Sequence, residues 1–188
     1  MPLESVTERL TLEQNQVLKA SARLDYRGVT IKWVQDTLHI RIRTVKVHNK
    51  SMFTQLNVNE IFSAVAYALN NGIIDLSDVV VSEEQLESII NTIENREYGN
   101  RTYLTAGGYS VLREYYTRSL ETGNLVGKQV VERVDLNLRT IQEFVRELYT
   151  KTPANNRAQL AVIGYIQDQL IKGEDVRKQY RGSAQPVS

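Results

Sequence analysis

The sequence has 188 residues, a formal net charge of +1, and 41% hydrophobic and 24% charged residues, a composition typical of one globular domain of ordinary size. It contains no cysteine, which excludes disulfide bonds, thiolate nucleophiles and cysteine-ligated metal sites. No apolar stretch approaches the roughly 20 residues that a membrane-spanning helix needs, and the first residues do not have the pattern of a signal peptide. We therefore expect a cytoplasmic protein with no membrane partner.

The charges are unevenly distributed along the chain. Residues 26–50 contain six lysines and arginines and a single acidic residue, whereas residues 51–95 contain seven acidic residues and no lysine or arginine. A basic segment followed directly by an acidic one indicates either two complementary surfaces within the chain or surfaces that meet other molecules.

The N-terminal segment is predicted to combine a helix with a β-hairpin. Residues 3–22 have apolar residues at helical spacing, and Thr11 followed three positions later by Gln14 fits a capping box. From 29 to 34 and from 38 to 47 the apolar residues alternate with polar ones, which is the period of a half-buried strand. We therefore predict an antiparallel hairpin over about 28–47, with its turn at Gln35 and Asp36.

The rest of the chain is predicted to be a bundle of four to five helices. The expected helices are 60–70 with Asn59 as its cap, a helix that begins after Ser82, 105–122 ending at Gly123, and a last helix from Pro153 to about Lys172. Apolar residues recur every three or four positions over 126–149, which is either one helix or two divided at Asp135. The predicted class is thus α+β and predominantly helical, with an N-terminal unit (1–55), a helical domain (56–173) and a mobile tail (174–188).

The sequence contains no motif for catalysis. A glycine-rich nucleotide loop, a zinc-protease motif and a nucleophile elbow are all absent from it. The two histidines, His39 and His48, are too few to hold a metal ion without further ligands that the spacing does not indicate. We therefore expect no catalytic residue, metal ion, cofactor or small-molecule substrate, and we expect that the protein is not an enzyme.

The basic side of the hairpin is the best candidate for a binding surface. Strand alternation would place four side chains next to one another and outward, with two lysines nearby; the six residues are Lys32, His39, Arg41, Arg43, Lys46 and Lys50. An acidic partner surface would comprise Glu60, Glu83, Glu84, Glu87 and Glu94. Three uses of the basic surface stay open: contact with a protein, contact with a phosphate backbone, and simple protection of exposed strand edges.

Two functions from different classes follow from these alternatives. The first is a non-enzymatic assembly, adaptor or structural protein, such as a subunit of a larger particle, in which unlike surfaces of neighbouring copies or of a protein partner meet. The second is a nucleic-acid-binding protein that uses the hairpin. The sequence resembles no family that would decide between them.

Overall fold

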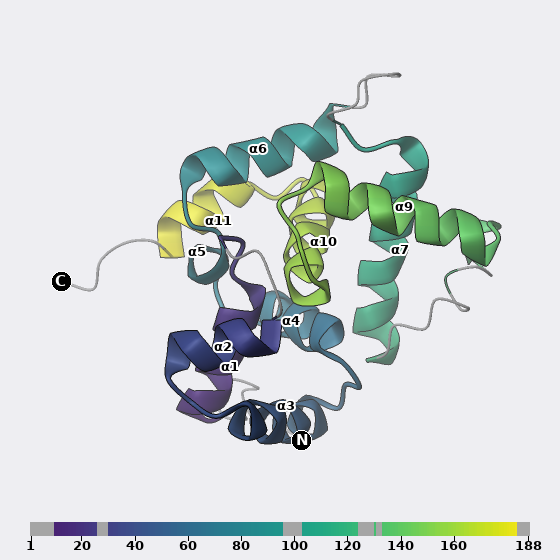
Figure 1. The fold of residues 1–188 in the computed structure, drawn as a ribbon. Coiled ribbons are helices and arrows are strands. Elements are labelled where there is room, and N and C mark those ends of the chain that lie inside the picture. The colour runs from purple at the N-terminus through teal and green to yellow at the C-terminus, as the bar shows by residue number, and fades with distance from the viewer. Residues whose placement is uncertain (1–9, 26–29, 96–102, 124–129, 131–132, 184–188) are drawn as a thin grey trace, which may run out of the picture.

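The computed structural model describes residues 10–25, 30–95, 103–123, 130 and 133–183. These residues form ten α-helices and no β-strand (Figure 1). The helices are α1 (Leu12–Ala22), α2 (Thr30–Leu38), α3 (Ile42–Leu56), α4 (Ile61–Asn70), α5 (Leu76–Val79), α6 (Glu83–Glu94), α7 (Ala106–Thr122), α9 (Leu138–Lys151), α10 (Arg157–Ile171) and α11 (Val176–Ser183). The predicted α+β class is therefore wrong, because the segment expected as a hairpin forms α2 and α3.

The apolar pattern of this segment fits helices better than strands once longer stretches are considered. On α2, Ile31, Val34 and Leu38 follow at intervals of three and four residues, and all pack in one small cluster. On α3, the buried residues Val45, Met52 and Leu56 also lie on one helical face. Over only a few residues, an apolar pattern can fit both the period of a helix and the period of a strand. The strand prediction was based on segments too short to distinguish the two.

The predicted turn at Gln35 and Asp36 lies inside α2, and the chain reverses three residues later. His39 has φ 53°, in the left-handed region, and the Ile40 amide N–H donates to the Gln35 carbonyl at 3.2 Å. This hydrogen bond spans the end of α2 in the manner of a Schellman motif, in which a left-handed residue ends the helix. The last residue before α3, Arg41, is extended. A turn of three residues thus joins α2 to α3.

Helices α1, α2 and α3 share a minor core. It contains four buried side chains, one or two from each helix, which are Val17, Ala20, Val34 and Val45. The Trp33 indole N–H donates to the Ala20 carbonyl at 3.1 Å, and the Gln14 side-chain amide donates to Ser51 Oγ at 3.0 Å. The first bond ties α2 to α1, and the second ties α3 to α1, so all three helices are fixed to one another.

The main core surrounds α4 and α10. Both helices are buried over most of their length, and small residues such as Ala64, Ala68 and Ala161 let other helices approach them closely. Helices α6, α7, α9 and α11 lie around α10 (Figure 1). Leu18 of α1 and Met52 of α3 reach the same core, so the N-terminal unit is anchored to the body rather than separate from it.

The N-terminus of α7 packs tightly against α9. A Cβ added at Gly107 would lie 2.1 Å from the Phe144 ring, so the glycine permits close approach of the two helices. The Glu147 carboxylate accepts the backbone N–H of Thr105 at 2.7 Å and its hydroxyl at 2.8 Å. Asn137 caps α9, whereas one of the two sequence-based alternatives divided 126–149 at Asp135, which has φ 49°; residues 126–129, 131 and 132 lie outside the described residues.

Three other boundaries differ from the sequence-based expectations. The helix predicted from Pro153, α10, begins at Arg157 with Asn156 as its N-cap. Glu60, rather than Asn59, is the N-cap of α4. Residues 176–183 were expected to belong to a mobile tail, but they form α11, in which Val176 is buried. The capping box at Thr11, the cap at Ser82 and the left-handed stop at Gly123 are confirmed.

Candidate nucleic-acid interface

Helices α2 and α3 are joined by a short turn, and α1 packs against both. The turn comprises His39, Ile40 and Arg41, a length that also occurs in the helix-turn-helix motif. Val34 and Val45 lie on either side of the turn, and both side chains are fully buried in the minor core. The buried sides of the two helices are thereby fixed, which leaves the opposite side of α3 facing outward.

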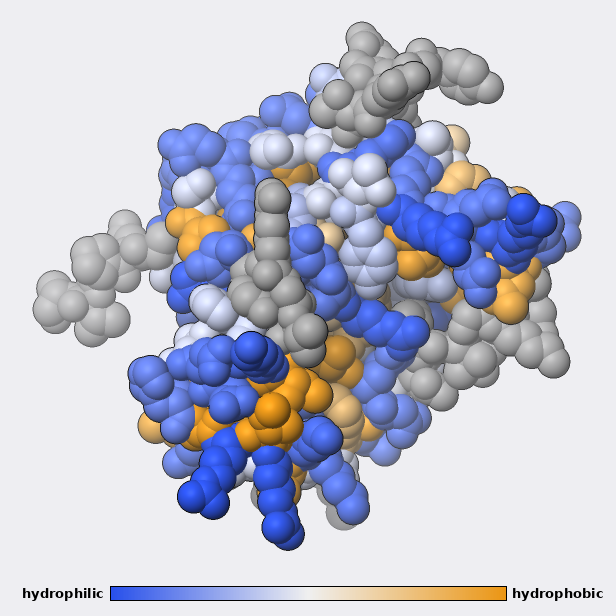
Figure 2. All heavy atoms as spheres, viewed as in Figure 1, coloured by the Kyte–Doolittle hydropathy of each residue, from blue (hydrophilic) through white to orange (hydrophobic). Residues whose placement is uncertain are grey.

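The outward side of α3 is basic. Arg43, Lys46 and Lys50 follow at intervals of three and four residues, and all are exposed. Val47 and Thr54 lie on the same side, and Val47 is 59% exposed although it is apolar. Figure 2 shows hydrophilic side chains that project from the α3 end of the molecule, away from the body. We call these five residues the α3 face.

The cations of this region have no acidic partner among the described residues. Thirteen N–O contacts within 4.0 Å form ion pairs in the described part of the chain, and none of them involves Arg41, Arg43, Lys46 or Lys50. Repulsion between like charges on one helix face costs some stability. A surface that keeps its positive charges uncompensated is suited to an anionic partner.

The N-terminus of α3 adds to this positive potential. Its N-cap residue, Arg41, makes no side-chain hydrogen bond to the helix, and the first turn has no acidic residue. By contrast, Thr11, Ser82, Thr105, Asn137 and Asn156 each cap their helices with a side-chain oxygen. The first-turn amides of α3 therefore have no side-chain acceptor among the described residues, and the positive end of the helix dipole lies beside Arg41 and Arg43.

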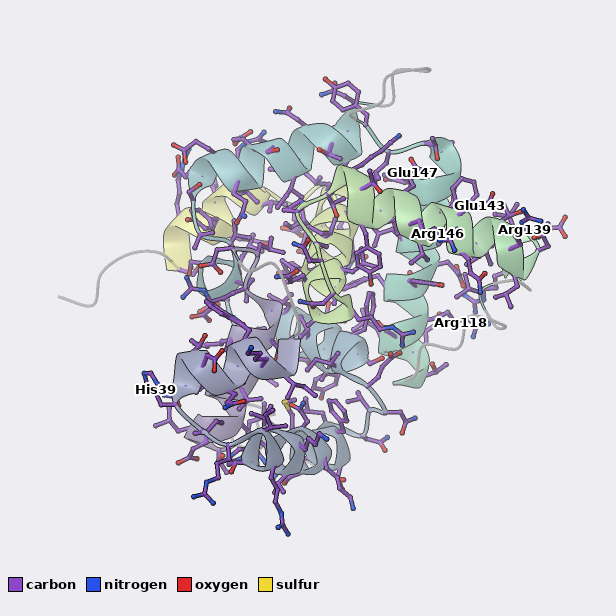
Figure 3. The ribbon with its side chains drawn as sticks, in the orientation of Figure 1. His39, Arg118, Arg139, Glu143, Arg146 and Glu147 are labelled. Carbon is purple, nitrogen blue, oxygen red and sulfur yellow. The ribbon has the colours of Figure 1, made fainter. Side chains whose placement is uncertain are left out.

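The six predicted binding residues lie on three different parts of this motif. Lys32 is exposed on α2, and His39 and the N-cap residue Arg41 are exposed in the turn. His39 is visible at the outer end of α2 in Figure 3. The remaining three lie on the α3 face. The predicted ribbon, which would have set Lys32, His39, Arg41 and Arg43 side by side on paired strands, does not exist. What the structure brings together is a helical row of Arg43, Lys46 and Lys50.

The predicted acidic surface is largely paired with bases of the same chain. The Arg177 guanidinium donates twice to the Glu87 carboxylate, at 2.6 and 2.8 Å. Arg181 donates to Glu83 at 2.9 Å, so α11 is held against α6 by two ion pairs. Glu60 pairs with a third arginine, in α10, at 2.8 Å. Only Glu84 and Glu94 of the predicted set make no ion pair among the described residues.

Sequence reasoning missed the apolar and neutral members of the α3 face. Val47 is an exposed large hydrophobic, and it was assigned to a strand. The helical spacing of Val45, Met52 and Leu56 would have identified the buried side of α3, and the opposite side then follows from the 3.6-residue period.

Comparisons with known proteins found no relative of this chain. No family model matches the chain, and no curated protein or solved structure matches it significantly.

Within the described part of the chain, no three histidine or acidic side chains gather where they could hold a metal ion. None of the described helices is both long and apolar enough to cross a membrane.

Proposed function

We propose that the chain binds double-stranded DNA and that α3 lies in the major groove. In helix-turn-helix proteins the second helix of the motif enters the groove, and the first crosses the backbone. The α3 face supports this assignment because it is the outward side of the second helix. The observation that carries the proposal is the row of Arg43, Lys46 and Lys50, exposed and unpaired among the described residues.

The dimensions of α3 suit the major groove. With 15 residues, it is about 22 Å long, and a B-DNA major groove about 12 Å wide admits one α-helix. The minor core holds α3 through Val45, while Met52 and Leu56 anchor it in the main core. A recognition helix fixed at several points can present its side chains without losing much further freedom on binding.

The α3 face offers two kinds of contact. Arg43 lies near the start of the helix, from which side chains reach base edges, and a guanidinium pairs well with guanine N7 and O6. The exposed Val47 matches a thymine methyl group. Lys50, Arg41 and the uncapped amides of α3 would bind phosphate oxygens, which fix the position of the protein but carry no sequence information.

A charge-matched pair of double variants tests the proposal. Arg43→Glu with Lys50→Glu reverses two charges on the α3 face. Arg139→Glu with Lys178→Glu makes the same change in net charge at side chains that are 90% and 83% exposed elsewhere. In fluorescence anisotropy with a random-sequence duplex at low salt, we expect the first variant to lose roughly a hundredfold in affinity and the second to stay within a few-fold of the native protein. Equal losses would show that net charge alone, and not α3, determines binding.

Assembly with an acidic protein remains the second candidate function for the same surface. The internal pairing of Glu83 and Glu87 with α11 disfavours a contact between the basic side of one copy and α6 of the next. An external acidic partner is still compatible with the unpaired cations of α3. Light scattering over a range of protein and salt concentrations, with and without duplex, distinguishes the two: salt-sensitive self-association without DNA binding would favour assembly.

A further inference from the structure

A cleft lies between α4, α7, α9 and α10, away from the α3 face. It has a volume of about 470 Å³ and is lined on its α9 side by Ile141, Val145, Arg146 and Tyr149. Small-molecule sites in proteins commonly have volumes of about 300–1,000 Å³, and the volume of this cleft lies within that range. We call it the α9 cleft.

The inner wall of the α9 cleft is apolar and aromatic. Phe62 and Leu160 are buried beneath it. The rings of Phe62 and Tyr115 are 6.5 Å apart and meet edge to face, at 86°. A wall of this kind accepts a flat ring, because it offers dispersion contacts and aromatic edges without requiring hydrogen bonds.

Several polar groups converge at the mouth of the cleft. The hydroxyl groups of Tyr115 and Tyr149 make no hydrogen bond with the described residues. Burial raises the pKa of both phenols, against the opposing effect of Arg157, so both remain neutral O–H donors at physiological pH. The Arg157 guanidinium itself is held by Glu60 at 2.8 Å.

Arg146 gives the mouth its uncompensated charge. It is exposed and lines the cleft, and it forms no ion pair with any described residue. Because Arg157 is already neutralised by Glu60, the local charge at the mouth is positive. Free guanidinium donors beside two phenolic O–H groups suit a carboxylate, which an arginine binds with two parallel hydrogen bonds.

We propose that the α9 cleft binds a small aromatic carboxylate, with its ring against Phe62 and Tyr115 and its carboxylate on Arg146. Tyr149 donates a further hydrogen bond to the carboxylate. A cationic ligand would be repelled by Arg146, and an uncharged aromatic ligand would leave the guanidinium without a partner. This site is additional to the DNA-binding function and does not depend on it.

Calorimetric titration of the full chain with 2-naphthoate and with its neutral counterpart, 2-naphthamide, tests the proposal. We expect one saturable site for naphthoate and binding of the amide that is weaker by roughly tenfold or more. Arg146→Gln should weaken naphthoate binding by a similar factor and remove most of the preference over the amide. Tyr149→Phe should produce a smaller loss.

Arg139→Gln is the matched control, because it removes the same charge from another turn of α9 (Figure 3) at a side chain that is 90% exposed and does not line the cleft. It should leave naphthoate affinity unchanged. Absence of saturable naphthoate binding at millimolar concentration would overturn the proposal. Equal affinity for naphthoate and naphthamide would also overturn it, as would equal losses in Arg146→Gln and Arg139→Gln.

Discussion

The helix-turn-helix unit and the body of this protein use charge and burial in opposite ways. In the body, α4 and α10 are buried along most of their length, and each of α6, α7, α9 and α10 carries charged residues that form ion pairs. In α1–α3 the minor core is small, and the cations of α3 are left without partners among the described residues. The difference indicates that the ion pairs and the main core of the body stabilise the fold, whereas the exposed cations of α3 form no ion pair with the described residues that would do so.

The largest expected effect concerns the body. Phe62→Ala removes a fully buried ring from the main core and should lower the free energy of unfolding by about 3–5 kcal/mol. Urea unfolding followed by far-UV circular dichroism measures this loss. Phe62→Leu, which keeps most of the volume, should cost about 1.5 kcal/mol or less. If Phe62→Ala and Phe62→Leu lowered the free energy of unfolding by similar, small amounts, the stability of the body would not depend on packing around Phe62.

A change in the minor core should affect the two regions unequally. Val34→Ala removes two methyl groups from a fully buried position and should cost about 2 kcal/mol. The only tryptophan, Trp33, lies in α2, so its fluorescence reports on α1–α3, while circular dichroism reports on the whole chain. We expect the fluorescence transition to move to lower urea than the dichroism transition. Coincident transitions would instead make the two regions one cooperative unit.

The Glu147 carboxylate provides a pH test for the body. Burial disfavours its ionised form, but hydrogen bonds from Thr105 and Lys151 outweigh burial and hold the pKa of Glu147 below its ordinary value. A carboxylate with a lowered pKa stabilises the fold at neutral pH, and this stabilisation is lost as the pH falls below the ordinary value of 4.5. Glu147→Gln should therefore cost about 1–2 kcal/mol at pH 7 and progressively less in acid; a constant difference would contradict this role.

The smallest effect is expected at the turn. His39 is held at φ 53°, a conformation that costs a non-glycine residue about 1 kcal/mol. His39→Gly should therefore stabilise the protein by about 0.5–1 kcal/mol in urea unfolding. His48→Gly is the contrasting variant, because His48 lies within α3, where glycine destabilises by about 1 kcal/mol. Destabilisation by both changes would mean that the left-handed turn does not form.

The sequence predicted the body better than the α1–α3 unit, for a physical reason. Helices such as α6 and α7 are long enough for a helical period to be recognised, and their ends bear strong signals at Ser82 and Gly123. Helix α2 has only nine residues, and its apolar residues also fit strand alternation over a short window. The left-handed residue that ends α2 is a histidine rather than a glycine, so the turn carried no composition signal.

The candidate site was predictable only in part. The density of bases between 26 and 50 drew attention to all six predicted residues, and all six are exposed. Their spatial relationship depends on whether the segment is helix or strand, because a helix aligns residues three and four apart and a strand aligns residues two apart. The pairing of Glu83 and Glu87 with α11 depends on tertiary packing, which local sequence patterns do not contain.

The salt dependence of duplex binding by single neutralised variants tests the central proposal most directly. If α3 lies against DNA, the logarithm of the native affinity falls linearly with the logarithm of salt concentration. Lys46→Gln and Lys50→Gln should each reduce the steepness of that fall by about one unit, while Arg139→Gln should leave it unchanged. Identical slopes for the native protein and all three variants would contradict the account.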